Sequence, residues 1–246
     1  MQFAEPLGYL FGNRLTQADQ AVAHKVEAIR QSVANGGAVY HPVSSGLDIA
    51  RTSAQTAFVS SVTPEWGIFL YLCAKSFGAQ TILELGASAG ISGAYLASAP
   101  NCRAFTTLEG SPELAKLARK SISQVAGNFT VIDGFFDDVL DETLSGIGEP
   151  LDLVYVDGPK EFESTIACLQ KITPSLKQGS LIIFDDIHWS QEMWQMWQAI
   201  GRMRGVAHAV NSGRFGLALW HGGSILPRKA DFSLLAGWLR VGKGYN

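Results

Sequence analysis

The chain has 246 residues, a formal net charge of -3 and an apolar fraction of 47%. A chain of this length can bury a large core, and its weakly acidic balance gives no general attraction for nucleic acid or for an acidic membrane surface. The best uncharged apolar run, Trp66 to Ala74, is far shorter than the ~20 residues that a membrane span needs, and the N-terminus shows no basic leader before a long apolar stretch. We therefore expect a soluble, cytoplasmic protein without a nucleic-acid or membrane partner.

The cysteines agree with a reducing compartment. Cys73, Cys102 and Cys168 are widely separated, and Cys73 and Cys168 lie beside apolar residues. They lack the close pairing that is typical of a zinc or redox motif, so the sequence predicts buried free thiols.

The N-terminal part of the chain predicts a helix followed by a loop. Apolar residues recur at helical spacing between Asp19 and Ala34, and Asn35-Gly36-Gly37 stops the run. This amphipathic helix could serve a homodimer. Residues 38–62 are rich in Ser and Thr and show no sustained period, so we expect a long ordered loop or lid there.

A small-residue turn between a strand and a helix is the clearest local signal. Pro64 suits the first turn of a helix that reaches about Phe77, and a buried strand over Thr81–Leu85, a turn over Gly86–Gly90 and a helix opening at Ile91 come next. Glycine lets the backbone approach a ligand closely, and the amides at a helix N-terminus suit an anionic or polar group. The alternative is a turn whose small residues serve packing alone.

Strands and helices then alternate along the chain. We expect strands over Ala104–Leu108, Phe129–Ile132, Leu151–Val156 and Ser180–Phe184, and helices over Pro112–Ala126, Asp137–Leu144, Glu161–Ile172 and Ser190–Met203. Alternation of this kind builds a parallel sheet with helices on both faces, so the fold class is α/β. Two last strands, Ala207–Val210 and Phe215–Leu219, are joined by too short a connection for a crossover, which predicts an antiparallel hairpin.

These elements suggest one main domain with two appendages. We expect an N-terminal extension over residues 1–63, the main domain over residues 64–222 and a tail over residues 223–246. The tail should make one more helix around Phe232–Leu239 and pack on the main domain.

The residues that follow the strands are the candidates for a site, because a ligand of an open α/β sheet lies beyond the carboxyl ends of the strands. In this chain they are Gly86 to Gly90, Glu109, Asp133, Asp157 with Lys160, and Asp185 with Asp186. Acidic groups therefore gather on one edge of the predicted sheet.

The turn does not carry a dinucleotide fingerprint. G-x-G-x-x-G starting at Gly86 would need glycine at positions 88 and 91, where the chain has Ser88 and Ile91. What remains is E-x-G-x-x-x-G from Glu84 to Gly90, followed one strand later by Glu109. A carboxylate at that place can accept both hydroxyls of a ribose, although Glu109 could instead be an acidic charge near a helix N-terminus.

The motifs LELGASAG and TTLEGSPE, together with the terminal hairpin, resemble the class I S-adenosylmethionine-dependent methyltransferases over about Pro64 to Trp220. The resemblance implies a Rossmann-like, doubly wound sheet of seven strands with an antiparallel terminal strand. It also implies S-adenosylmethionine (SAM) as the cofactor. The residues expected to hold it are Glu84, Gly86, Ala87, Ser88, Gly90, Glu109, Asp133 and Asp157.

Two later motifs, VDGPKEF and LIIFDDIHWS, resemble the metal-dependent O-methyltransferases of the catechol and caffeoyl-CoA type. Asp157, Lys160 and Asp185 match that family's pattern, and Asp186 stands where the family has Asn. The resemblance implies Mg²⁺ or another divalent cation at Asp157, Asp185 and Asp186. A second departure is Phe135, which follows Gly134 where the family has a small or acidic residue, so Asp133 or stacking on Phe135 would serve the adenine.

Methyl transfer to a hydroxyl needs an aligned nucleophile and a base. Carboxylates supply the oxygen ligands that Mg²⁺ prefers, and a bound cation would lower the pKa of a coordinated hydroxyl. Lys160 or His188 would take the proton, although nearby carboxylates favour the charged form of Lys160. The alternative is that the aspartates cap turns and that Lys160 is a solvated surface residue.

The tryptophans after the Asp pair divide between two interpretations. Trp189 is adjacent to the expected ligands and is assigned to the acceptor site. Trp194 and Trp197 have the spacing of a core-facing helix stripe.

The sequence thus predicts a SAM-dependent O-methyltransferase that acts on a small-molecule acceptor. Two alternatives stay open. One is a metal-independent methyltransferase for a sugar or natural-product hydroxyl with His188 as the base, and the other is a non-catalytic protein that binds SAM.

Overall fold

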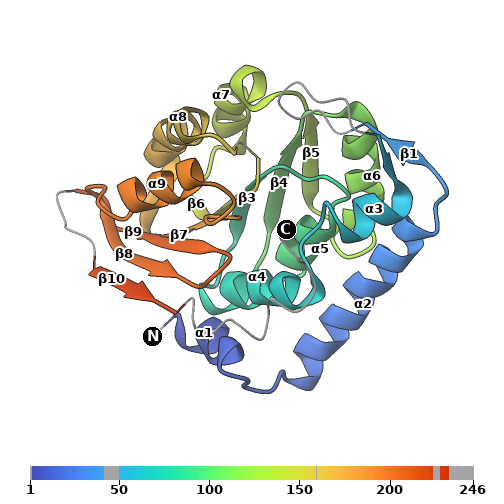
Figure 1. The fold of residues 1–246 in the computed structure, drawn as a ribbon, viewed down its shortest axis with the longest axis horizontal. Coiled ribbons are helices and arrows are strands. Elements are labelled where there is room, and N and C mark those ends of the chain that lie inside the picture. The colour runs from blue at the N-terminus through green and yellow to red at the C-terminus, as the bar shows by residue number, and fades with distance from the viewer. Residues whose placement is uncertain (1, 42–49, 159, 224–227, 233–246) are drawn as a thin grey trace. The chain divides into compact units, whose positions relative to one another are not determined.

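The computed structural model describes residues 2–41, 50–158, 160–223 and 228–232. The chain divides into two compact units, one up to Val139 and one from Leu140 onward. Eight of the described strands are assigned to a mostly parallel sheet that includes antiparallel pairs (Figure 1). The predicted α/β class is confirmed, with one strand more than the seven expected. The predicted division at residues 63 and 222 stays a prediction.

The first unit begins with short elements around one long helix. They are α1 (Ala4–Leu10), α2 (Gln17–Ala34), β1 (Val39–Tyr40), β2 (Arg51–Thr52), α3 (Ser53–Phe58) and α4 (Pro64–Ser76). Helix α2 starts where Thr16 and Asp19 form a reciprocal capping box, which satisfies backbone N–H groups at its N-terminus. Val26, Ile29 and Val33 of the expected apolar stripe of α2 are buried, and α4 confirms the helix predicted from Pro64.

The long loop predicted over residues 38–62 is wrong where the structure describes it, whereas the role of a lid stays a prediction. Strands β1 and β2 pair antiparallel, and α3 follows directly with its own capping box between Thr52 and Gln55. Local hydrogen bonds therefore order a segment that shows no sequence period. Residues 42–49 lie outside the described residues.

A buried ion pair joins α2 to α3 and α5 of the first unit. Arg30 is fully buried and donates from Nε to Glu27 at 2.7 Å and from Nη1 to the carbonyl oxygen of Ala57 at 2.7 Å. Tyr95 donates its hydroxyl to the same Glu27 at 2.9 Å. Gly67 of α4 gives the ring of Tyr95 room, since a Cβ there would overlap the ring.

The sheet strands of the first unit are β3 (Thr81–Leu85), β4 (Ala104–Glu109) and β5 (Phe129–Asp133), with α5 (Ile91–Ala97) and α6 (Pro112–Ile122) between them. Strand β4 pairs in parallel with both neighbours, and Glu109 is in register with Asp133. The predicted strands and helix starts are confirmed. Helix α6 ends at Ile122, before the predicted Ala126, and the chain continues there as a turn.

The second unit holds β6 (Leu151–Val156), β7 (Leu176–Phe184), β8 (Val206–Asn211), β9 (Gly216–Trp220) and β10 (Arg228–Asp231). Its helices are α8 (Phe162–Ile172), η1 (Thr173–Ser175) and α9 (Gln191–Ile200), and α7 (Phe136–Ile147) runs across the boundary of the two units. Strand β6 is parallel to β7, whereas β9 is antiparallel to both β7 and β8. The predicted terminal hairpin is confirmed.

Strand β10 is an element that the sequence did not predict. It pairs in parallel with β8, and all of its residues are exposed. The predicted tail helix falls on residues 233–239, outside the described residues. Among the residues that the structure describes, no helix is long and apolar enough to cross a membrane.

Candidate functional site

The turn after β3 has the strained backbone that its small residues suggest. Gly86 and Gly90 have φ of +98° and +76°, and Ser88 has φ of +46°, which few residues other than glycine adopt. Ala87, between them, is buried. A Cβ on Gly90 would lie 2.7 Å from the Cα of Ala118 in α6. This packing explains the glycine at position 90. It does not explain the positive φ of Ser88, which points to a role of that residue in the function of the turn.

Glu109 fastens this turn to the end of β4. Its Oε2 accepts the backbone N–H of Ser88 at 2.7 Å, and its Oε1 accepts the N–H of Ser111 at 3.0 Å. Burial raises the pKa of Glu109 even though the N–H groups of Ser111, Ser88 and Ala87 act to lower it. A carboxylate has about four lone-pair sites, so these donors leave room for a ribose hydroxyl.

The other candidates of the first unit lie at different depths. Glu84 is fully buried and accepts the hydroxyl of Thr107 at 2.7 Å. Asp133 is exposed at the end of β5, in register with Glu109. Phe135 is 54% exposed, and its ring lies beside Gly110, where an added Cβ would be 3.5 Å from the ring. The structure thus brings the turn, Glu109 and the end of β5 together, while the binding roles of all these residues stay predictions.

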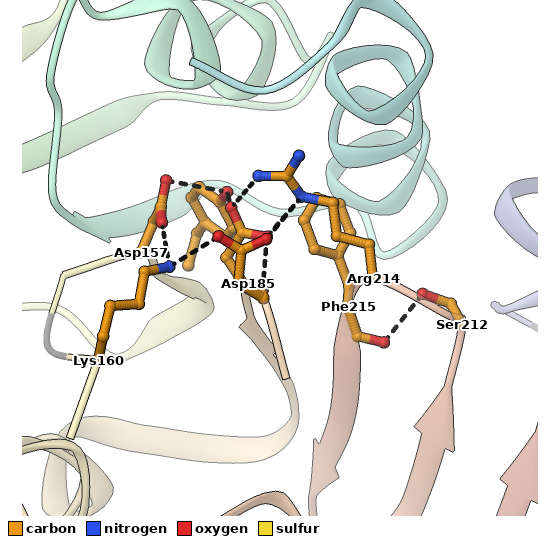
Figure 2. A network of polar contacts seen from close by, with 8 residues as sticks. Asp157, Lys160, Asp185, Ser212, Arg214 and Phe215 are labelled. Carbon is orange, nitrogen blue, oxygen red and sulfur yellow. Dashed lines mark hydrogen bonds and ion pairs between the residues drawn. The ribbon is translucent and has the colours of Figure 1, made fainter. Parts of the chain in front are cut away.

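The second unit contains the predicted acidic cluster. Asp157 follows β6 and Asp185 follows β7 (Figure 2), and Asp186 is the next residue of the chain. One oxygen of each of these carboxylates lies within 4.8 Å of the others. Asp186 has φ of +50°, and its N–H donates to Asp185 Oδ1 at 2.6 Å. The donor type and spacing fit a hard divalent cation.

Lys160 lies inside this cluster. Its Nζ donates to Asp157 at 2.8 Å and to Asp186 at 3.2 Å. Burial lowers the pKa of Lys160, but the carboxylates of Asp157, Asp185 and Asp186 raise it more, so the pKa lies above its ordinary value. The ion pairs therefore hold the proton on Lys160 and oppose its predicted role as a base.

Arg214 is the member of the cluster that sequence reasoning missed. Its Nε and Nη2 donate to the two oxygens of Asp185 at 2.6 and 2.7 Å, and Nε lies 3.4 Å from Asp186. Tyr155 donates its hydroxyl to Asp185 at 2.8 Å. Only the topology could have pointed to Arg214, because it belongs to the hairpin whose second strand returns beside β7.

Arg214 and Lys160 affect the pKa values of the neighbouring carboxylates differently. Burial acts to raise the pKa of Asp185, but the Arg214 guanidinium holds it below its ordinary range. Burial raises the pKa of Asp157 to about 7, and Lys160 only partly offsets this, while Asp185 and Asp186 add to the rise. Neighbouring carboxylates of one cluster thus differ in how readily they ionise.

His188 and the tryptophans lie near the end of the acidic stretch. His188 is exposed and stacks on Trp194, with ring centroids 4.6 Å apart. Trp189 is 58% exposed, as a contact for an acceptor would need. Trp197 is buried beside Phe184, which confirms the core interpretation of that residue.

Likeness to known proteins supports the fold of the central region. Residues 83–187 match the model of a methyltransferase domain. The solved O-methyltransferase of Bacillus cereus in complex with SAH matches 83% of this chain and 97% of its own, with a TM-score of 0.59 and 23% identity. The chain therefore has the Rossmann-like fold of methyltransferases, as predicted.

Two relatives narrow the resemblance. Catechol O-methyltransferase of Mycobacterium tuberculosis is 32% identical over 129 residues, which are 52% of this chain and 57% of the relative. Catechol O-methyltransferase of Niastella koreensis is 34% identical over 130 residues, with coverages of 52% and 58%. The predicted resemblance to class I SAM-dependent O-methyltransferases of the catechol and caffeoyl-CoA type is confirmed. The chain spans a little over half the length of these curated relatives.

Proposed function

We propose that this protein is a SAM-dependent methyltransferase that methylates a hydroxyl of a small molecule. The observation that carries the proposal is the link between Glu109 and Ser88, because it sets a buried carboxylate against a backbone-strained turn at the carboxyl ends of two parallel strands. The match to a methyltransferase domain over residues 83–187 and the catechol O-methyltransferase relatives support it.

The reaction is a displacement at carbon. The acceptor oxygen bonds to the methyl carbon as the bond from that carbon to sulfur breaks, and the electron pair stays on sulfur to give the neutral thioether of SAH. The hydroxyl proton leaves to a base. The chain has to orient the ribose through Glu109, hold the turn open at Ser88 and align the acceptor with the methyl group.

We further propose that Asp157, Asp185 and Asp186 hold a divalent cation, since their oxygens match in type and spacing. A bound cation would lower the pKa of the acceptor hydroxyl. A metal-independent reaction is the second candidate, and the ion pairs of Lys160 and Arg214 within the cluster favour it. In that reaction exposed His188 would take the proton.

Cofactor binding is tested by calorimetric titration with SAM and SAH. A charged hydrogen bond contributes about 1.5–3 kcal/mol, so Glu109→Gln should weaken binding by about tenfold or more. Glu113→Gln, an exposed residue at the start of α6, is the matched control and should bind like the wild type. Absence of binding to the wild type at sub-millimolar ligand would sink the proposal.

Methyl transfer is tested with a catechol acceptor in the presence and absence of a chelator. If the cation takes part, the chelator and Asp185→Asn both abolish turnover while SAM binding persists. Asp141→Asn, on the exposed face of α7 in an ion pair with Lys171, is the control. Turnover that survives both treatments supports the metal-independent reaction instead.

Binding of SAM without transfer to any of a broad panel of acceptors would favour the non-catalytic alternative. The cytoplasmic location, the lack of nucleic-acid and membrane partners, and the homodimer stay predictions.

A further inference from the structure

The carboxylate of Asp185 is saturated with hydrogen bonds. Its Oδ1 accepts Nε of Arg214 at 2.6 Å and the N–H of Asp186 at 2.6 Å. Its Oδ2 accepts Nη2 of Arg214 at 2.7 Å and the hydroxyl of Tyr155 at 2.8 Å. A carboxylate has about four lone-pair sites, so these donors leave none for a cation. A divalent ion can reach Asp185 only if one donor leaves.

Arg214 is the donor that can leave. Tyr155 is fully buried, and the N–H of Asp186 is a backbone group next to the carboxylate it binds. The side chain of Arg214 is 12% exposed and extends from a turn rather than from a strand (Figure 2). It is also the partner whose positive charge opposes that of an entering ion.

Hydrogen bonds within and beside the hairpin fix the backbone of Arg214. Gly213 has φ of +101°, and its N–H donates to the side chain of Asn211 at 2.9 Å, while Ser212 donates from its N–H and its hydroxyl to the carbonyl oxygen of Phe215. The carbonyl oxygen of Arg214 accepts the N–H of Ile187 at 3.2 Å. These bonds hold the backbone of Arg214 beside the Asp pair, so withdrawal of the guanidinium requires only rotation of its side chain.

We infer that Arg214 is a built-in competitor of the divalent cation and sets the affinity of the acidic cluster for it. Arg214 fills two positions on Asp185 that an ion needs, and an ion binds when the guanidinium moves away. This inference rests on the proposed function for the identity of the cluster as a cation site. It adds a residue that determines when that site is available.

Metal affinity measures this competition directly. Mn²⁺ is titrated into wild type, Arg214→Met and Arg214→Lys, and free Mn²⁺ is followed by electron paramagnetic resonance. Removing one positive charge within about 4 Å of the site should tighten Mn²⁺ binding about tenfold or more in Arg214→Met. Arg214→Lys keeps the charge but loses the paired bonds, so its gain should be smaller.

Arg204→Met is the matched control, because it removes the same charge from an exposed residue of the same unit. An unchanged affinity in folded Arg214→Met, or an equal gain in Arg204→Met, overturns the inference. SAM is titrated into the same proteins. Loss of SAM binding by all of them contradicts the proposed function, whereas normal SAM binding with no gain for Mn²⁺ contradicts only the competition.

The wild type supplies a second measurement, because Arg214→Met leaves the buried Asp185 without its guanidinium and could unfold. The Nε–H resonance of Arg214 is assigned as the cross-peak that Arg214→Lys lacks. It should exchange slowly with solvent in the absence of metal, then shift and exchange faster as Mg²⁺ is added. A resonance that Mg²⁺ leaves unchanged overturns the inference.

Discussion

At the scale of single residues, Tyr155 is the buried anchor of the acidic cluster. Its hydroxyl donates to Asp185 at 2.8 Å, and its ring packs edge-on against Phe215, with centroids 5.8 Å apart. Desolvation by burial and the neighbouring carboxylates raise the pKa of Tyr155 well above its ordinary value, which favours the protonated hydroxyl that donates to Asp185. The residue therefore stabilises the charge of Asp185.

Tyr155→Phe should lower the free energy of unfolding by about 1–3 kcal/mol, because a charged acceptor loses a buried donor without a change of shape. Urea unfolding followed by circular dichroism measures this. Tyr40→Phe, in the first unit, is the control and should change stability much less. A Tyr155→Phe protein as stable as the wild type would mean that Arg214 and the N–H of Asp186 satisfy Asp185 without the hydroxyl.

The residues of the candidate site could be predicted from the sequence where they directly follow a strand. Asp157, Asp185 and Asp186 follow strands directly, and parallel pairing of β6 with β7 brings their ends together. Arg214 lies within the turn between β8 and β9 and not directly at a strand end. Its approach to Asp185 depends on antiparallel pairing of β9 with β7. No local sequence pattern indicates which side chain of the turn points toward Asp185.

At the scale of elements, the close approach of α5 and α6 depends on Gly90. This residue is the N-cap of α5 with φ of +76°, and a Cβ on it would meet the backbone of Ala118. The turn that Glu109 holds ends at this residue. Any change that separates the two helices therefore also displaces the proposed cofactor turn.

Gly90→Ala should lower the free energy of unfolding by about 2–4 kcal/mol, since the left-handed backbone costs 1–2 kcal/mol and overpacking adds a similar amount. Gly146→Ala, in α7, is the matched control. A Cβ on Gly146 would point into open space among the described residues, so this variant should gain about 0.5–1 kcal/mol. Chemical denaturation of both variants measures the difference, and equal stabilities would contradict the close approach.

Helices and strands could be predicted where the pattern of apolar residues was clear. Strands β3 and β6 and the starts of α4, α5 and α6 agree with the sequence pattern to the residue. Helix α3 and strand β10 were missed for a physical reason. The first is held by a Thr52 capping box within a polar segment, and the second is a fully exposed edge strand, so neither shows alternation of apolar and polar residues.

At the scale of the whole molecule, the proposed cofactor site and the acidic cluster belong to different compact units. The turn and Glu109 lie in the unit that ends at Val139, and the acidic cluster lies in the unit that begins at Leu140. The methyltransferase match over residues 83–187 takes in both. The proposed methyl transfer therefore draws on residues of both units, whereas the proposed cofactor binding and cation binding can be measured separately.

Ligand-dependent stability tests which nucleotide the whole chain recognises. A ligand present at about 100 times its Kd stabilises the native state by about 2.7 kcal/mol. For a chain of this length that corresponds to a rise in Tm of roughly 5–10 °C. SAH should produce this rise, whereas NAD should not, because Ser88 and Ile91 replace two glycines of the dinucleotide fingerprint. Differential scanning calorimetry measures both shifts, and a rise with NAD equal to that with SAH would contradict the assignment of the turn to SAM.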